Sequence, residues 1–288
     1  MANTNHVENP LEFAVEKTAW AFRDLGRTIV PHPERHAGKT IPQIRRIGLA
    51  DLRDALRAGV SDMAAFRDDV IFIAIIYPLA GLLLARLAFS RELLPMLFPL
   101  ASGFAIIAPV AATGLYEMSR RREAGRHVTW MDAFGAFASP AIGSIIGMGV
   151  ILLALFSLWL GAAYQIGLAT LGPEPAPTLR AFTHDVFWSE ASPALIAGGI
   201  AAGFVFAAVA FVLSVVSVPL LLDRDVGLRI AIAASIKAVW TNLGTMVVWA
   251  AIIALALALG SLPALVGLIF VVPILGHASW HLYRKVVA

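Results

Sequence analysis

The sequence contains no cysteine and few charged residues. The absence of cysteine excludes disulfides, thiolate zinc sites, iron–sulfur clusters and cysteine nucleophiles. Only 14% of the 288 residues are Asp, Glu, Lys or Arg, whereas 59% are hydrophobic. Soluble domains carry about 25% charged residues. The composition therefore predicts an integral membrane protein, with the lipid bilayer as its first partner.

The positive net charge does not indicate a nucleic-acid-binding protein. The formal net charge is +3, but the basic residues lie beside apolar runs and are mixed with acidic residues. This pattern is typical of membrane topology signals and differs from that of a basic arm. We therefore expect no nucleic-acid partner.

Apolar runs long enough to cross a bilayer as helices recur along the chain after residue 69. They predict an all-α membrane protein with six transmembrane helices, in a domain that covers residues 70–288. The six spans are Val70–Phe89, Leu93–Tyr116, Ala141–Tyr164, Ala194–Leu222, Val239–Leu259 and Leu262–Trp280. The fourth is longer than about 20 residues, the length that a span requires, so it should tilt or break near Pro219.

Residues 1–69 are expected to form a cytoplasmic segment of amphipathic helices. The periodicity predicts one such helix over Leu49–Phe66, and it assigns Asp62 to the charged side of that helix. The apolar face carries Leu52, Leu56, Gly59, Met63 and Phe66. Such a helix lies on the membrane or packs on the spans. A small soluble partner-binding domain is the alternative.

The distribution of Lys and Arg predicts the orientation. Nineteen of the 22 basic residues lie in residues 1–69, after spans two and four, or in the tail. The other three are Arg86, Arg91 and Arg180. Because basic residues favour the cytoplasmic side, both termini of this multi-pass protein are predicted to be cytoplasmic.

Parts of the chain resemble one another. The segment Gly103–Pro109 (GFAIIAP) aligns with Gly267–Pro273 (GLIFVVP), and Arg120 and Arg284 each follow eleven residues after the proline. Short segments of mixed polarity precede the odd spans, at Leu49–Phe66, Val128–Ser139 and Gly227–Ala238. We therefore predict three repeated units, each an interfacial helix followed by a helical hairpin.

The polar candidates lie at the ends of the predicted spans. Those expected to serve topology or an interface are Arg120, Arg121, Arg122, Asp223, Arg224, Asp225, His277 and His281. We expect a balanced charge cluster around Asp223 and Asp225, with a lipid-headgroup or metal site as the alternative. The two histidines are four residues apart and could share a metal, but no further ligand is identifiable, so an interfacial pair is expected.

Small residues indicate where helices approach each other closely. The helix-packing candidates are Gly143, Gly147, Gly199 and Gly203. We expect them to pack within one molecule, and an oligomer face is the alternative.

Four ordered motifs resemble a known family. They are YPLAGLLL (Tyr77–Leu84), LLPMLFPLASGFAIIAPVAATGLYEMSRRRE (Leu93–Glu123), PLLLDRDVG (Pro219–Gly227) and LGHASWHLYR (Leu275–Arg284). Together they are similar to the DUF2189 family of bacterial predicted integral membrane proteins, over most of the chain from about Ile41 onward. The resemblance implies the inner (plasma) membrane of a Gram-negative bacterium. The family has no established activity, so it supplies no functional residues.

Some members of that family are labelled as cytochrome c oxidase subunit I. A haem–copper centre needs several histidine ligands inside the membrane. Of the seven histidines here, only His277 lies within a predicted span. We therefore do not expect a catalytic oxidase subunit.

No catalytic motif is recognisable, so we predict no enzyme activity, no cofactor and no bound metal. The expected function is that of a non-catalytic accessory, assembly or interaction protein of other membrane proteins, with a respiratory complex suggested by the family label alone. Its partners would be other integral membrane proteins or a second copy. The alternative is a small-molecule or lipid transporter or channel, which the repeat and the prolines within spans suggest.

Overall fold

A computed structural model describes residues 40–65, 95–174, 176, 178–262 and 266–288. In this part, helices are joined by short connections, and one isolated antiparallel bridge links Ile44 to Val287. The helices are α2 (Leu49–Ala65), α4 (Leu97–Ala111), α5 (Thr113–Glu123), the 3₁₀ helix η2 (Trp130–Ala138), α6 (Ile142–Leu171), α7 (Leu179–Trp188), α8 (Ser192–Ser214), α9 (Ser217–Asp223), α10 (Leu228–Thr241), α11 (Leu243–Ser261) and α12 (Leu268–Val286). The all-α prediction is confirmed for these residues.

Within the described residues, four helical stretches are long and apolar enough to cross a membrane. They are Leu97–Glu123, Ile142–Leu171, Ser192–Asp223 and Leu243–Ser261. They correspond to predicted spans two to five. The first predicted span, Val70–Phe89, lies outside the described residues.

The sixth predicted span, Leu262–Trp280, is not confirmed. The helix in this region, α12, has 19 residues and is not among the four candidate spans. Its second half carries two histidines, Arg284 and Lys285, which shorten the apolar part. The predicted span ends at Trp280, whereas the helix itself continues through polar residues to Val286.

The three-unit repeat is also not confirmed. Helices α2, η2 and α10 do occur where the segments of mixed polarity were identified. However, α6 and α8 are joined through a further helix, α7, and the chain after α11 leads into α12. The two aligned segments differ as well, because α4 ends at Ala111, whereas α12 continues without a break past Pro273.

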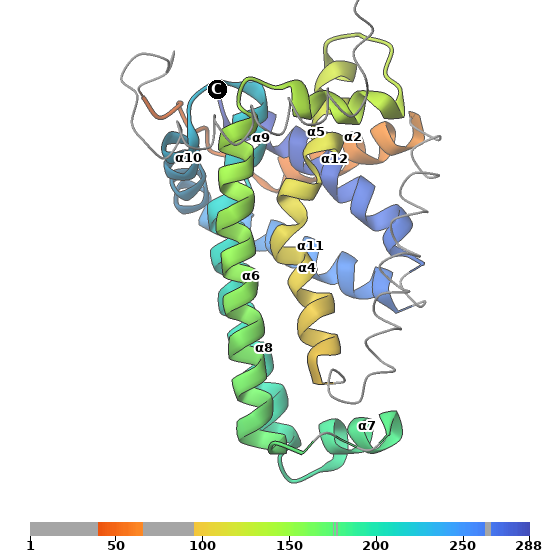
Figure 1. The fold of residues 1–288 in the computed structure, drawn as a ribbon. Helices are drawn as coiled ribbons and strands as arrows, with labels where there is room; N and C mark the ends of the chain where they lie inside the picture. The colour runs from red at the N-terminus through yellow and green to blue at the C-terminus, as the bar shows by residue number, and fades with distance from the viewer. Residues whose placement is uncertain (1–39, 66–94, 175, 177, 263–265) are drawn as a thin grey trace, which may run out of the picture.

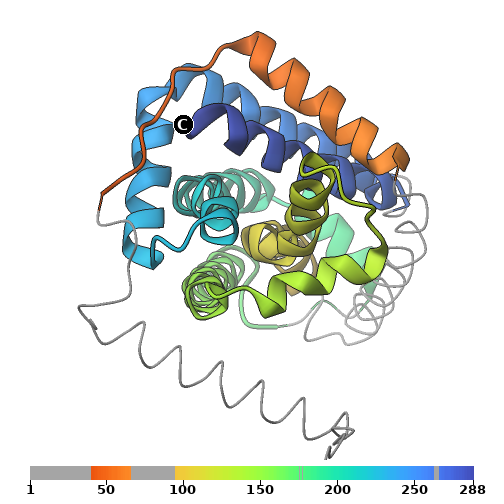
Figure 2. The ribbon, with the colours of Figure 1, turned by 90° about the horizontal axis from the view of Figure 1, so that it is seen from above.

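The helices form an upright group and a layer at one end of it. Figure 1 shows α4, α6 and α8 running along the molecule, with α7 beyond one end of α6 and α8. Helices α2, α5, η2, α9, α10 and α12 gather at the opposite end, which we call the charged end. From above, α4, α6 and α8 are seen nearly end-on, while α2, α10, α11 and α12 lie lengthwise around them (Figure 2).

Aromatic side chains fill the space between α4, α6 and α8. Trp159 of α6 is buried, and its indole N–H donates to the carbonyl oxygen of Pro99 at 2.9 Å. Its ring centroid lies 5.9 Å from that of Phe206 on α8. Gly103 of α4 faces Phe156 and Trp159, and the space beside it is too small for a Cβ. Large rings against a small residue give the dense packing of a protein interior.

The long apolar stretch Ser192–Asp223 breaks between α8 and α9, as the sequence predicted. Pro219 has no N–H to donate to the carbonyl of Val215, so the helical hydrogen-bond pattern is interrupted there. Next to this break, Ser235 of α10 bridges a second backbone pair, because its hydroxyl accepts from the N–H of Val216 at 3.2 Å and donates to the carbonyl of Val212 at 2.8 Å, two groups that a continuous helix would join directly. A hydroxyl from a neighbouring helix commonly satisfies backbone groups freed in this way.

The chain before α2 is fastened to the junction of α10 and α11. Asn242 accepts from the N–H of Ile47 at 2.9 Å and donates to the carbonyl of Arg45 at 3.0 Å. The hydroxyl of Thr245 donates to the carbonyl of Ile47 at 3.0 Å. These bonds fix where α2 begins.

Helix α2 packs closely along α12. It buries a stripe of residues at helical spacing, Leu52, Ala55, Gly59 and Asp62. A Cβ at Gly59 would lie 2.6 Å from the carbonyl oxygen of Ile274 and 2.7 Å from the backbone nitrogen of Ala278. The helix at Leu49–Phe66 is thus confirmed, with its last position, Phe66, outside the described residues.

The assignment of Asp62 to the charged face is wrong. Asp62 is only 4% exposed and completes the buried stripe. Its polar partners come from α5 and α12, far away in sequence, so the local periodicity could not reveal that this position is buried.

The close contact at Gly59 predicts the effect of a single methyl group. We expect Gly59→Ala to lower the stability of the purified protein by about 1–3 kcal/mol, because the new Cβ must push apart two helix backbones. Thermal unfolding in detergent measures this change.

Gly161→Ala in α6 is the matched control, because a Cβ there meets nothing within 4 Å. Alanine favours a helix over glycine by up to about 1 kcal/mol, so the control should be unchanged or stabilised. Equal behaviour of the two variants would contradict the proposed close contact.

Candidate functional site at the charged end

Asp62 is the centre of a buried polar cluster where α2, α5 and α12 meet. Its Oδ2 accepts hydrogen bonds from Ser119 Oγ at 2.6 Å and His281 Nε2 at 2.8 Å. Arg122 Nη1 donates to Oδ1 at 2.5 Å. His277 Nδ1 lies 2.8 Å from Ser119 Oγ and 4.0 Å from Asp62 Oδ2. Both predicted histidines therefore converge on one carboxylate.

The surroundings of Asp62 favour its ionised form. Burial alone would raise the pKa of Asp62, but hydrogen bonds from His281 and Ser119, together with the charges of the two histidines, hold it below its usual range. The carboxylate thus remains an acceptor with two oxygens at neutral pH. An ionised carboxylate can accept all the hydrogen bonds that Ser119, Arg122 and His281 donate from α5 and α12.

The cluster contains the residue types of a hydrolase triad in a different arrangement. In a triad, histidine bridges the carboxylate and the serine. Here Ser119 bridges Asp62 and His277, and it is completely buried. The arrangement therefore links α2, α5 and α12 through hydrogen bonds to one serine. In the ranges that the structure describes, no group of three or more His, Cys, Asp or Glu residues could hold a metal ion.

Glu117 organises a second cluster on the other side of α5. It is 1% exposed and accepts from Arg120 Nε at 2.8 Å and Arg120 Nη2 at 2.9 Å, in the fork geometry of a strong pair. It also accepts from Arg121 Nε at 2.6 Å. Arg121 continues to Asp132 of η2, whose side chain caps its own helix by accepting from the N–H of Thr129 at 2.8 Å.

Asp223 joins the end of α9 to α12. Its Oδ2 accepts from the hydroxyl of Tyr283 at 2.6 Å and from Arg284 Nη1 at 3.4 Å. Arg284 also donates to Glu123 of α5 at 3.0 Å, as does the indole N–H of Trp280 at 3.1 Å. Two carboxylates at the ends of two apolar stretches are thereby bound to one face of α12.

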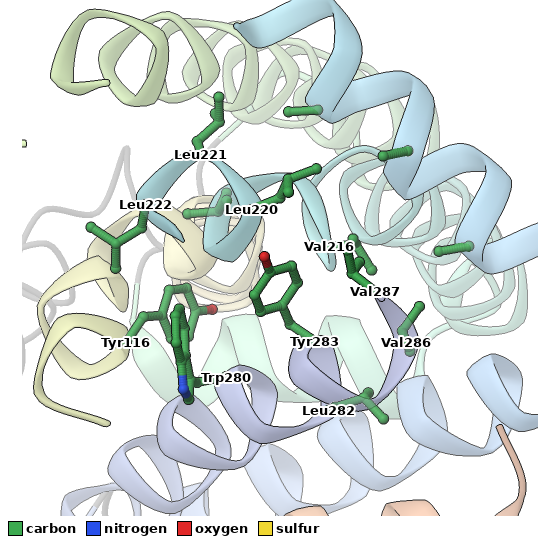
Figure 3. Close-up of a cluster of buried hydrophobic side chains, with 14 of the residues drawn as sticks. Tyr116, Val216, Leu220, Leu221, Leu222, Trp280, Leu282, Tyr283, Val286 and Val287 are labelled. Atoms are coloured by element: carbon green, nitrogen blue, oxygen red, sulfur yellow. The ribbon is translucent and has the colours of Figure 1, made fainter. Parts of the chain in front are cut away.

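An apolar cluster lies beneath these polar contacts. Figure 3 shows Tyr116 of α5 together with Trp280 and Tyr283 of α12 beside α9, which contributes Leu220 and Leu222. All five are at most 5% exposed. Tyr116 and Trp280, which each follow the proline of one of the two aligned segments by seven residues, thus share one core.

A pocket of about 340 Å³ opens between α5, η2 and α9. Five of the eight predicted polar residues line it: Arg120, Arg121, Asp223, Arg224 and Asp225. Glu117 adds a third acid, so acids and arginines are balanced around the opening. The other three predicted residues, Arg122, His277 and His281, belong to the Asp62 cluster.

The predicted glycines have different surroundings. A Cβ at Gly147 would lie 3.0 Å from the side chain of Leu228, and one at Gly203 would lie 3.3 Å from Trp159. Gly143 is buried in α6. A Cβ at Gly199 would meet nothing within 4 Å. Among the described helices, Gly59 and Gly103 make closer contacts that the small-residue pattern did not identify.

Some of the missed residues carry a local signal and others carry none. Glu117 precedes Arg120 and Arg121 by three and four residues, the spacing of ion pairs on a helix. Asp132 follows Thr129 by three residues, as in a capping box. Asp62 and Ser119 carry no such signal, because their partners are on other helices.

Comparison with known proteins identifies part of the chain. Residues 96–223 match the family model described as predicted integral membrane protein (DUF2189). This segment belongs to the DUF2189 family. Neither curated proteins nor solved structures gave a match.

The DUF2189 segment is narrower than the motif resemblance suggested. It runs through α4 to the end of α9, so it contains the Glu117 cluster and Asp223. The motifs Tyr77–Leu84 and Leu275–Arg284 lie outside it, as do Asp62 and both histidines. The charged end of this protein therefore joins the DUF2189 segment to helices on either side of it.

The Asp62 cluster predicts a dependence of stability on pH. Because its folded-state pKa is lowered, the stabilising effect of Asp62 is present above the unfolded-state pKa of about 3.9 and is lost as pH falls below it. Asp62→Asn should lower stability at pH 7 by about 1–3 kcal/mol and reduce the loss between pH 4 and pH 2. Unfolding followed across pH measures both effects.

Asp54→Asn is the control, because Asp54 is exposed and pairs with Lys285 at the surface. It should keep the stability and acid response of the unaltered protein. If Asp62→Asn did the same, the ionised carboxylate would not be what holds α2, α5 and α12 together.

The bond between Tyr283 and Asp223 makes a separate prediction. Tyr283→Phe removes a buried hydrogen bond to a carboxylate and should cost about 1.5–3 kcal/mol of unfolding free energy. Tyr164→Phe, at a position 56% exposed on α6, should change stability by less than about 0.5 kcal/mol. Thermal unfolding that does not distinguish the two variants would argue against the link between α9 and α12.

Proposed function

We propose that this protein is a non-catalytic integral membrane protein that binds another integral membrane protein inside the bilayer, through the outer face of α8. The observation that supports this proposal is a shaped apolar face that the described chain leaves uncovered. On this face, Ile200 is 63% exposed, Phe204 is 73% exposed and Val205 is 58% exposed.

The outer face of α8 combines a shallow strip with a ridge. Ala194, Ala197 and Ala201 are exposed at helical spacing and form the strip. Ile200 and Phe204 lie next to it, four residues apart, and form the ridge. In lipid, helices associate by close packing, and small residues allow the backbones to approach. The fitting partner is therefore an apolar transmembrane helix.

Helix α7 adds a second exposed surface next to the start of α8. Its end is held by Ser189 and Ser192, whose hydroxyls donate to the carbonyl of Asp185. Phe187 and Trp188 are 59% and 72% exposed, and their rings contact each other. Exposed aromatic residues at the end of a membrane helix suit either an interfacial anchor or a contact with a partner.

The proposal includes the bacterial inner membrane, with the charged end in the cytoplasm. Its support is the distribution of charge among the described helices. Arg120, Arg121, Arg122, Arg284 and Lys285 lie on helices of the charged end, while Arg180 lies on α7 at the other end. Basic residues favour the cytoplasmic side of a bacterial membrane.

Transport, the alternative suggested by the sequence, gains no specific support. The reason is that the space between α4, α6 and α8 is occupied by the side chains of Trp159, Phe156 and Phe206. Nothing in the described residues indicates a respiratory complex in preference to another partner.

Site-specific crosslinking tests the proposed function. Because the chain has no cysteine, Ala197→Cys and Ala201→Cys each introduce a single thiol on the proposed face. Leu255→Cys, on an exposed face of α11, is the control. After labelling with a thiol-reactive benzophenone in native membranes, the α8 variants should give one discrete adduct, identified by mass spectrometry as another integral membrane protein.

A bulky residue in the strip gives an independent test. Ala201→Leu should abolish the adduct from Ala197→Cys without lowering the unfolding temperature, because Ala201 is exposed on the described chain. Gly161→Leu, at an equally open position on α6, should leave the adduct in place. Equal adducts from α8 and α11, no adduct at all, or an adduct of twice the chain mass would each overturn the proposal.

A further inference from the structure

A groove of about 570 Å³ lies between α2 and α11. Leu56 and Val60 of α2 and Val248 and Ile252 of α11 form its apolar lining. Val60 is 51% exposed and Val248 is 39% exposed, so the lining is open to the surroundings. The groove is separate from the pocket at α5 and α9 and from the outer face of α8.

Two arginines lie along one edge of this apolar lining. Arg53 and Arg57 are one helical turn apart on α2, and both are exposed. Within the described ranges neither has an ion-pair partner, whereas the nearby Asp51 and Asp54 are both paired with Lys285. Like charges four residues apart on a helix repel each other. An anion between them would relieve that repulsion.

The position of the groove indicates where its ligand comes from. Helix α11 is one of the candidate membrane spans, and Val247, Leu255 and Leu259 continue its exposed apolar surface. The groove is therefore open to the layer that acyl chains would occupy. Its two arginines lie at one edge, on an amphipathic helix of the kind that rests at the headgroup level.

We infer that the groove between α2 and α11 binds an anionic phospholipid, with an acyl chain along Leu56, Val60, Val248 and Ile252 and the phosphate between Arg53 and Arg57. A neutral lipid would use the apolar lining and leave the arginines unpaired. A free anion would pair with the arginines and leave the lining uncovered. An anionic phospholipid satisfies both parts of the groove.

Lipid binding to the full-length protein tests this inference. Purified protein in a neutral detergent at low ionic strength is titrated with dioleoyl phosphatidylglycerol, and bound lipid is counted by native mass spectrometry. The variant Arg53→Gln/Arg57→Gln is compared with Arg46→Gln/Arg229→Gln, which removes the same charge from exposed positions on the same end. Dioleoyl phosphatidylcholine and inorganic phosphate are the comparison ligands.

We expect the first variant to weaken phosphatidylglycerol binding about 30-fold, since each basic residue near an anionic headgroup contributes about fivefold. The second variant should change binding less than about threefold. Val60→Gln, which makes the open lining polar, should weaken phosphatidylglycerol binding while both arginines remain. Unfolding temperatures measured without lipid show whether each variant is folded.

Three results would overturn the inference. Equal weakening by the two charge variants would indicate a general effect of net charge. Equal binding of phosphatidylcholine would indicate unselective contact with lipid. Competition by millimolar inorganic phosphate, together with no effect of Val60→Gln, would indicate an anion site that does not use the groove.

Discussion

The buried carboxylate of Asp62 is the interaction on which the arrangement of the charged end depends. It receives donors from α5 and α12, and Gly59, one turn earlier, lets α2 approach α12 closely enough for those bonds to form. A buried charge without partners costs several kcal/mol, so the three helices are stable together only in the arrangement that satisfies it. Close backbone contact and charge pairing thus support each other.

The three consecutive arginines at the end of α5 have a structural role in addition to the topological one expected from the sequence. Arg120 forms a fork with Glu117, Arg121 connects Glu117 to η2, and Arg122 reaches Asp62 on α2. Arg120 and Arg121 share Glu117 on their own helix, whereas Arg121 and Arg122 reach two different neighbouring elements, because successive positions on a helix point about 100° apart. One short basic segment therefore joins the DUF2189 segment to α2.

The uncovered surfaces differ in chemistry as well as in position. The outer face of α8 is wholly apolar and has an alanine strip beside a ridge of Ile200 and Phe204, a shape that suits another membrane helix. The groove of α2 and α11 joins an apolar lining to two arginines, which suits a lipid with a charged headgroup. The bilayer sets the rule for both surfaces, because apolar surface exposed to lipid carries no penalty and specificity must come from shape or charge.

Properties that depend on neighbours in sequence could be read from the sequence alone. The membrane class and spans two to five follow from apolar runs, and the break before Pro219 follows from its missing N–H. The tertiary structure decided the rest. Asp62 reads locally as a surface residue, and only contacts with residues 57 to 219 positions away bury it. Burial and pairing are properties of helices brought together in space, and the periodicity of one helix does not contain them.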